Sequence, residues 1–195
     1  MISFLLGLTL LGCPAKLQVD DSASASNKEP TPPPVLGVNE SEDCDQKALG
    51  SNVCNFFLLD QNGDYWELYD HKGKIIILDF STVWCYPCQM AAVHTQKIQD
   101  EYADDVVFVT LLVQGPEGLP ATDIDVNSWV QTYGITTAPV LQASPEYVMD
   151  QAGITGYLVG GYPTYVYLDR NLVITDAHVG FNEEYMKTIL DGMIQ

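Results

Sequence analysis

The sequence has few basic residues. Eight Lys and Arg stand against 26 Asp and Glu in a chain of 195 residues, which gives a formal net charge of −18. Proteins that bind nucleic acids use Lys and Arg to contact phosphates, so this composition argues against a nucleic-acid partner. It also disfavours electrostatic docking on anionic lipid, and it identifies no partner by itself.

The sequence also lacks a long hydrophobic run. No apolar stretch reaches the roughly 18 residues that predict a membrane-spanning helix. Apolar residues nevertheless make up 47% of the chain, which is enough for a sizeable core and excludes disorder of the whole chain. The length suits one domain with appended segments rather than two full domains.

The first apolar run is short and ends at a cysteine. Residues 2–11 suit the central region of a secretory signal, although no Lys or Arg precedes them. The ending Leu-Leu-Gly-Cys at Cys13 resembles a bacterial lipobox, in which the cysteine carries the lipid anchor. We therefore expect a lipoprotein-type signal peptide at 1–12 and lipidation at Cys13. A cleaved signal and a buried N-terminus with a chance cysteine are the alternatives.

The next segment has the composition of a tether. Residues 13–43 are rich in Ser, Ala, Pro and acidic residues, and Pro30-Thr31-Pro32-Pro33-Pro34 lies within them. Such a segment cannot bury enough apolar area to offset the entropy of ordering, so we expect disorder with a stiff proline spacer. A tether between a lipid anchor and a folded domain at 44–195 predicts a protein of the bacterial cell envelope, held on a membrane.

The chain contains five cysteines, an odd number. Assigning Cys13 to lipid leaves the Cys-x-x-Cys pair Cys85 and Cys88, and it leaves Cys44 and Cys54 to form a structural disulfide around a small loop. An oxidising compartment is consistent with this pairing. Free buried thiols at 44 and 54, or a four-cysteine zinc site, are the alternatives. The zinc site has poor spacing because there is only one Cys-x-x-Cys.

Strand and helix signals alternate from residue 55 onward. An Asn-Gly turn at 62–63 predicts a hairpin, and Asp123 or Asp125 could cap the helix that follows the second buried strand. A β-α-β unit followed by a hairpin and a helix predicts an α/β sandwich with a mixed sheet. We expect strands at 56–59, 65–68, 74–80, 106–113, 139–142, 164–168 and 173–179, and helices at 87–102, 125–133, from Ser144 onward and 182–194.

The Cys85–Cys88 pair directly follows a buried strand and begins a helix. A helix N-terminus offers unpaired N–H groups and partial positive charge, which favour a thiolate and should lower the pKa of Cys85. The thiolate is the attacking species in disulfide exchange, and the two-residue spacing lets Cys88 resolve the mixed disulfide. We therefore predict that Cys85 is the nucleophile and Cys88 the resolving thiol. A purely structural bridge is the alternative.

Two motifs carry a family resemblance. The segment 79–88, Asp-Phe-Ser-Thr-Val-Trp-Cys-Tyr-Pro-Cys, closely resembles the thioredoxin active site, and Gly-Tyr-Pro-Thr at 161–164 resembles that family's second signature. The Asp-Gln-Asn-Gly-Asp turn at 60–64, Gly73-Lys74 and the insert before residue 161 look more like the membrane-anchored TlpA/ResA subgroup. Over residues 53–195, this resemblance implies a thioredoxin-like three-layer sandwich, with helices flanking the sheet. It also implies a thiol–disulfide oxidoreductase that needs no cofactor beyond its redox-active disulfide.

The resemblance assigns a substrate-binding surface around the cysteine pair. Pro163 should follow a cis peptide bond, which would expose the backbone of Tyr162 for pairing with a substrate strand. Trp84 should shield the disulfide, with simple core packing as the alternative. Tyr86 and Pro87 lie between the cysteines, where residue identity helps set the reduction potential. Tyr86 stands where thioredoxin commonly has glycine, so the resemblance does not determine the reduction potential of the cysteine pair.

The resemblance also places Asp79 at the family's buried acid, beneath the active site. There it could take the proton from Cys88 if burial raises its pKa, with a solvent-exposed charge at a strand end as the alternative. The family suggests a reductase acting on disulfides of exported proteins, recharged by an upstream electron donor in the membrane. A disulfide donor and a non-catalytic module for copper delivery or partner binding are the alternative functions.

Weaker patterns suggest other chemistry. The Thr82-x-x-Cys85 spacing matches a peroxidase pattern, but the upstream proline of peroxiredoxins is absent. Copper delivery would favour Cys-x-x-x-Cys with a well-placed histidine, and we expect His94 and His178 to be surface residues rather than ligands. The acidic cluster at 100–105 is most simply a solvated helix end, with calcium binding as the alternative. We therefore predict no metal ligands.

Overall fold

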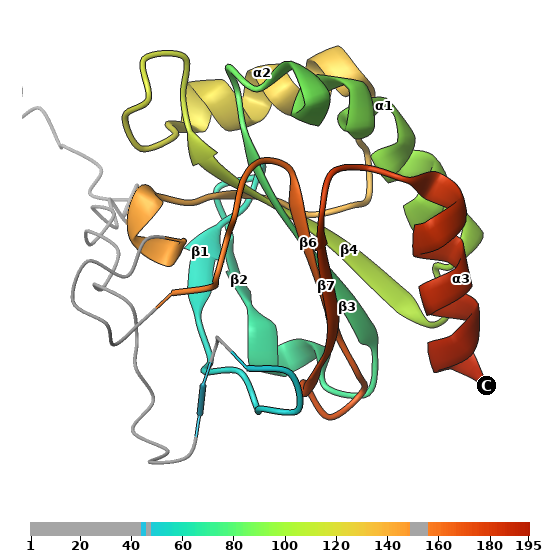
Figure 1. Ribbon diagram of the computed structural model, residues 1–195. Coiled ribbons are helices and arrows are strands. Elements are labelled where there is room, and N and C mark those ends of the chain that lie inside the picture. The colour runs from blue at the N-terminus through green and yellow to red at the C-terminus, as the bar shows by residue number, and fades with distance from the viewer. Residues whose placement is uncertain (1–43, 46–47, 149–155) are drawn as a thin grey trace, which may run out of the picture. The chain divides into compact units, whose positions relative to one another are not determined.

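The computed structural model describes residues 44–45, 48–148 and 156–195 (Figure 1). The signal peptide, Cys13 and the tether predicted for residues 1–43 lie outside the described residues. No helix in the described ranges is both long enough and apolar enough to cross a membrane.

The core of the domain is a five-stranded mixed sheet with the order β5-β4-β3-β6-β7. β3, β4 and β5 run parallel, whereas β6 is antiparallel to β3 and β7 is antiparallel to β6. This is the sheet expected from a β-α-β unit followed by a terminal hairpin. In chain order the strands are β3 (Ile75–Thr82), β4 (Val106–Gln114), β5 (Val140–Gln142), β6 (Thr164–Leu168) and β7 (Ile174–Val179).

Three α-helices cover one face of the sheet. Ile98 of α1 and Met186 of α3 share a buried cluster with Ile75 and Ile77 of β3, and α2 packs against the same face through Trp129. The continuous apolar sequence of β3 is explained by its central place in the sheet, where all eight residues are buried. The helices are α1 (Tyr86–Glu101), α2 (Asp123–Tyr133) and α3 (Glu183–Ile194).

The opposite face is covered mainly by a hairpin. Phe56, Trp66 and Tyr147 pack there in one cluster with Ile76 and Leu78 of β3. The α/β sandwich is confirmed, but its third layer is built by the hairpin and two short 3-10 helices instead of α-helices. These elements are β1 (Phe57–Leu59), β2 (Tyr65–Glu67), η1 (Leu68–His71) and η2 (Pro145–Tyr147).

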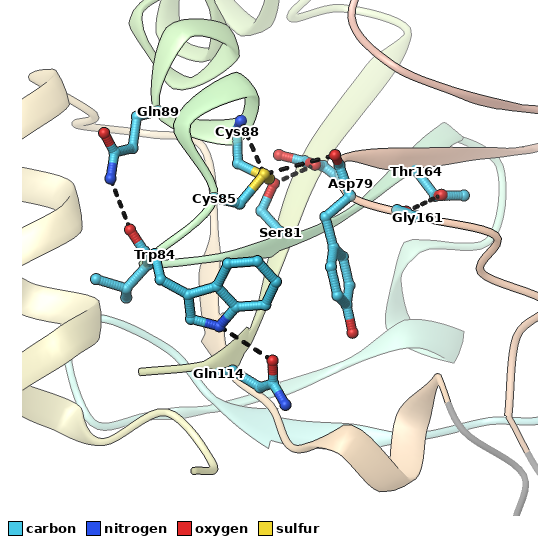
Figure 2. The surroundings of a disulfide bond; sticks show 11 residues. Asp79, Ser81, Trp84, Cys85, Cys88, Gln89, Gln114, Gly161 and Thr164 are labelled. Carbon is cyan, nitrogen blue, oxygen red and sulfur yellow. Dashed lines mark hydrogen bonds between the residues drawn. A yellow bond between two sulfur atoms is a disulfide. The ribbon is translucent and has the colours of Figure 1, made fainter. Parts of the chain in front are cut away.

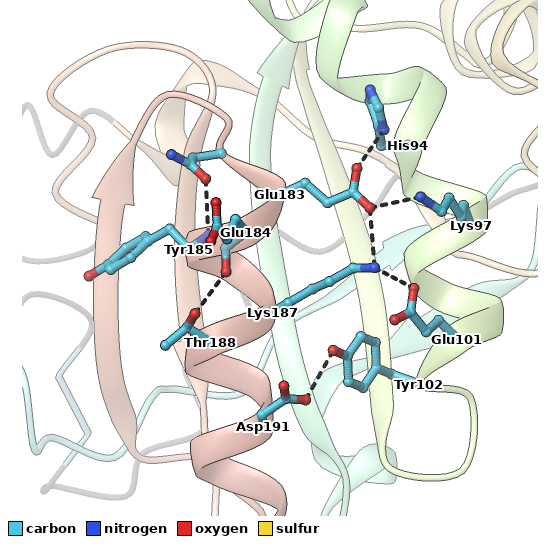
Figure 3. A network of polar contacts seen from close by, with 11 residues as sticks. His94, Lys97, Glu101, Tyr102, Glu183, Glu184, Tyr185, Lys187, Thr188 and Asp191 are labelled. Atoms are coloured by element: carbon cyan, nitrogen blue, oxygen red, sulfur yellow. Dashed lines mark hydrogen bonds and ion pairs between the residues drawn. The ribbon is translucent and has the colours of Figure 1, made fainter.

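A polar network joins the exposed sides of α1 and α3 (Figure 3). Glu183 accepts a hydrogen bond from Lys97 at 2.8 Å and lies 3.2 Å from Lys187, and these two cations lower the pKa of Glu183 to about 2. Lys187 also contacts Glu101 at 2.6 Å, and Tyr102 donates to Asp191. Each exposed ion pair alone contributes little to the free energy of folding. The network therefore adds to the apolar packing of the two helices on the sheet.

The N-terminal part of the domain is fastened to the β6–β7 turn. A disulfide joins Cys44 to Cys54, and the backbone N–H of Val53 donates to the carbonyl of Leu172 at 3.1 Å. Leu168, which precedes this turn, pairs with Ile76 near the start of β3. The entry of the chain therefore lies at the opposite end of the sheet from the C-terminal end of β3.

One expected helix cap is wrong, and one expected helix begins where predicted but is short. The N-cap of α2 is Thr122 rather than Asp123 or Asp125. The Thr122 hydroxyl accepts from the Asp125 N–H at 3.3 Å, and the Asp125 carboxylate accepts from the Thr122 N–H at 2.9 Å. This reciprocal capping box starts the helix at Asp123, two residues before the expected start at Asp125. The helix expected from Ser144 onward is the three-residue η2, and the Ser144 side chain caps nothing.

Candidate active site

The Cys85–Cys88 pair forms a disulfide at the start of α1. Cys85 is the N-cap residue, and its sulfur accepts a hydrogen bond from the backbone N–H of Cys88 at 3.2 Å (Figure 2). Both cysteines are almost fully buried, with 5% and 1% of their surface exposed. A sulfur held against the unpaired N–H groups of a helix N-terminus is placed where a thiolate is stabilised.

The loop before β6 brings a second segment to the disulfide. The peptide bond between Tyr162 and Pro163 is cis, and the Tyr162 carbonyl oxygen lies 3.5 Å from the sulfur of Cys85. Thr164 fixes this loop by donating its hydroxyl to the carbonyl of Gly161 at 2.6 Å. The two sequence motifs, separated by more than 70 residues, therefore meet at one site.

Aromatic side chains surround the cysteines on the surface. Trp84 is 51% exposed, and its indole N–H donates to the side-chain oxygen of Gln114 at 3.1 Å. The ring of Trp84 stands edge-to-face against Tyr162, with centroids 5.9 Å apart. Tyr86 is 69% exposed, and Pro87 beside it is exposed as well. This exposure rules out core packing as the role of Trp84.

Asp79 is buried on β3. Its carboxylate accepts hydrogen bonds from Ser81 at 2.7 Å and from Thr110 of β4 at 3.2 Å. Burial raises the pKa of Asp79 to about 7, against the opposing effect of these two hydrogen bonds. The alternative of an exposed charge at a strand end is therefore wrong.

The register of β3 places this acid under the active-site helix. Side chains two residues apart share one face of a strand, so Asp79 faces the same side as Ile77, which packs beneath α1 and α3. Asp79 lies near the C-terminal end of β3, where the chain turns into Cys85 and α1. The acid is thus on the helix side of the sheet, at the end where the cysteines stand.

Sequence reasoning missed several residues that support the site. Ser81 could have been found, because strand alternation puts it beside Asp79. Thr110 could have been found only by assuming the parallel register between β3 and β4. Gln114 carries no recognisable signal, although it holds Trp84. Gln89 was also missed, and it donates to the Val83 carbonyl at 2.8 Å, joining α1 to the loop before it.

The cysteines and histidines considered for metal binding have other partners in the structure. The four cysteines of the domain form two disulfides, so they do not assemble one zinc site. Within the described ranges, no group of three or more His, Cys, Asp or Glu side chains is placed to hold a metal ion. His94 contacts Glu183 at 3.1 Å, and His178 lies partly buried among tyrosine rings instead of on the surface as expected.

Comparisons with known proteins agree with this geometry. The thioredoxin-like protein YneN of Bacillus subtilis is 34% identical over 132 residues, which cover 67% of this chain and 71% of that protein. The thiol-disulfide oxidoreductase ResA of Bacillus anthracis is 27% identical over 153 residues, covering 78% and 80%.

A solved structure shows the same fold. The exposed lipoprotein thioredoxin Etrx1 of Streptococcus pneumoniae superposes with a TM-score of 0.57 at 27% identity, covering 72% of this chain and 98% of that one. The family model described as AhpC/TSA matches residues 49–177, which include both motifs of the site. The chain therefore belongs to the AhpC/TSA family of thioredoxin-like proteins.

Proposed function

We propose that this protein is a thiol–disulfide oxidoreductase that exchanges its Cys85–Cys88 disulfide with cysteine pairs of other proteins. The observation that carries the proposal is the sulfur of Cys85, which accepts the N–H of Cys88 at the start of α1 and faces the carbonyl of Tyr162. Relatives named thiol-disulfide oxidoreductase support the same activity.

The reductive cycle begins with the reduced pair. The Cys85 thiolate attacks a substrate disulfide, forms a mixed disulfide and releases one substrate thiolate. Cys88 then loses its proton to Asp79 and attacks the sulfur of Cys85, which releases the second substrate thiolate. Two electrons pass to the substrate, and the Cys85–Cys88 disulfide forms again. The Tyr162 backbone pairs with the substrate strand, and Trp84 covers the sulfurs.

The proposal includes a place for the protein in the bacterial cell envelope. The lipobox-like sequence at Cys13 supports a lipid anchor, and the disulfide between Cys44 and Cys54 fits an oxidising compartment. The relative Etrx1 is described as an exposed lipoprotein thioredoxin. In this setting we expect exported proteins as substrates and a membrane electron donor that recharges the pair.

Insulin reduction tests the activity. The purified protein with dithiothreitol should reduce insulin disulfides, and Cys85→Ser should abolish turnover because no other group supplies the attacking thiolate. A variant with serine at both 44 and 54 is the matched control, and it should keep turnover. Full activity of Cys85→Ser would refute the mechanism. Stoichiometric Cu(I) binding by a wild-type protein without turnover would favour metal delivery instead.

The reduction potential of the pair tests the direction. We would titrate the protein in glutathione or dithiothreitol buffers and count alkylated thiols by mass spectrometry. A potential at or below about −250 mV is expected for a reductant. A value above about −150 mV would instead identify a disulfide donor and reverse the proposed direction.

A further inference from the structure

A groove of about 230 Å³ lies beside the disulfide motif. One wall is formed by Val83 and Gln89, which flank the cysteine pair along the chain, and the other by side chains of α2. The most prominent of these are Asp125, Trp129 and Tyr133. Trp129 packs in the same buried cluster as both cysteines, so the groove and the disulfide share one framework.

Two aromatic side chains of α2 line the groove. The rings of Trp129 and Tyr133 stand edge-to-face with centroids 4.6 Å apart, and Trp129 is 4% exposed. The Trp129 indole N–H has no hydrogen-bond partner in the described part of the chain. Trp129 is buried and supports Tyr133, which is only half-buried. Because electron-rich ring faces attract cations, the ring of Tyr133 suits the stem and charge of a basic side chain.

The carboxylate of Asp125 is fixed in place beside these rings. Its Oδ2 atom accepts hydrogen bonds from the backbone N–H of Thr122 at 2.9 Å and from its hydroxyl at 2.7 Å. A Cβ at position 115 would lie 2.7 Å from the same oxygen, so Gly115 allows the carboxylate to pack against its loop. The groove therefore holds a preoriented negative charge.

In the part of the chain that the structure describes, no Lys or Arg forms an ion pair with this carboxylate. The ion pairs that Lys and Arg make in the described residues involve Glu101, Asp105 and Glu183, and none involves Asp125. The Oδ1 atom of Asp125 likewise has no partner in the described chain. The Asp125 carboxylate is partly buried, is oriented by Thr122 and shares the groove with the half-buried ring of Tyr133, so a cation in the groove would complement it.

We propose that this groove binds a Lys or Arg side chain of the substrate polypeptide, close to the disulfide being reduced. The inference rests on the proposed function and specifies its substrate class. Val83 and Gln89 flank the pair, so a substrate cysteine that reaches Cys85 brings residues a few positions away to the groove. Substrates whose cysteines are accompanied by a basic residue are therefore preferred.

The test compares two disulfide-linked peptides that are identical except for one residue near the cysteine, Lys in one and Gln in the other. The reduced full-length protein should reduce the Lys peptide with a kcat/KM about five- to tenfold higher. Asp125→Asn should bring this ratio close to one. Asparagine can still accept the hydrogen bonds from Thr122, and circular dichroism melts check that the fold is kept.

The matched control is Asp123→Asn, which removes the same charge from an exposed position in the same helix turn. It should leave the Lys preference intact. If both variants lost the preference for the Lys peptide equally, the preference would come from the overall negative charge of the protein. The proposed binding in the groove would then be overturned. Reduction of both peptides at equal rates by the wild type would overturn this inference alone, whereas reduction of neither would overturn the proposed function with it.

Discussion

At the scale of single residues, Asp79 has the clearest energetic signature. Its pKa is raised from 3.8 to about 7 by burial. Between these values the folded state holds a proton that the unfolded state has released, so stability falls as pH rises through this window. The shift corresponds to roughly 4 kcal/mol between its two ends. The acid that is proposed to accept the Cys88 proton therefore destabilises the fold when it is ionised.

Replacing Asp79 by Asn should stabilise the protein at pH 8 and flatten the pH dependence of unfolding between pH 4 and 7. Asparagine carries no charge and can still accept hydrogen bonds from Ser81 and Thr110. Disulfide-exchange turnover should fall on the order of 100-fold, because the proton acceptor is lost. Urea denaturation at pH 5 and pH 8 measures the first effect, and insulin reduction measures the second.

A surface variant provides the comparison for this experiment. Asp104 is exposed, so Asp104→Asn should leave both the pH dependence and the turnover close to wild type. If Asp79→Asn were less stable than wild type at pH 8, the ionised carboxylate could not be the destabilising group. If its turnover were normal, another proton acceptor would serve Cys88.

The positions of the site residues could be predicted from sequence because they occupy one short segment. Strand-to-helix placement marked Cys85 and Cys88, and the resemblance of residues 79–88 to the thioredoxin active site marked Asp79. Gln114 could not be predicted, since its contact with Trp84 depends on where β4 ends beside the β3–α1 loop. The groove residues Trp129 and Asp125 were equally hidden, because their position depends on how α2 packs.

At the scale of elements, α2 connects helix capping to the site. Thr122 and Asp125 cap each other, and the same carboxylate forms the charged end of the groove. Thr122→Ala removes the hydroxyl and should lower the free energy of unfolding by about 1 kcal/mol. Urea denaturation measures this loss, and the Lys-peptide preference should weaken because the carboxylate loses one of its two anchors.

Thr122→Ser keeps a hydroxyl and is the matched variant for this experiment. It should retain nearly all of the wild-type stability. Equal destabilisation by Ala and Ser would show that packing of the threonine methyl group, and not capping, stabilises the start of α2.

Most elements could be predicted from periodicity, but their ends depended on partners elsewhere. The strand at 74–80 and the helix at 182–194 were predicted from local signals, and they are present as β3 and α3. The start of α2 was missed because one candidate cap, Asp125, acts reciprocally with Thr122, three residues earlier. The signal at Ser144 marked where η2 begins but not its short length, and Tyr147, its last residue, packs against Phe56 in the core.

At the scale of the whole molecule, the main feature is the excess of acidic over basic residues. Residues 44–195 contain 6 Lys and Arg against 20 Asp and Glu, so the domain alone has 6 − 20 = −14 charges. Repulsion between like charges destabilises a compact state and is screened by salt. The melting temperature should therefore rise by about 3 °C or more between 20 mM and 500 mM NaCl, measured by circular dichroism.

KCl at matched ionic strength separates screening from specific ion binding. Both salts should give the same increase if screening is the cause. A melting temperature that falls with added salt would mean that ion pairs such as those of Lys187 outweigh the repulsion.

The N-terminal part of the domain and the reactive disulfide lie at opposite ends of β3. Residue 53 is bonded to the β6–β7 turn, at the end of the sheet where β3 begins, and the disulfide stands at the end where β3 finishes. Within the described residues, the fastened N-terminal part of the domain therefore does not lie over the cysteine end of β3.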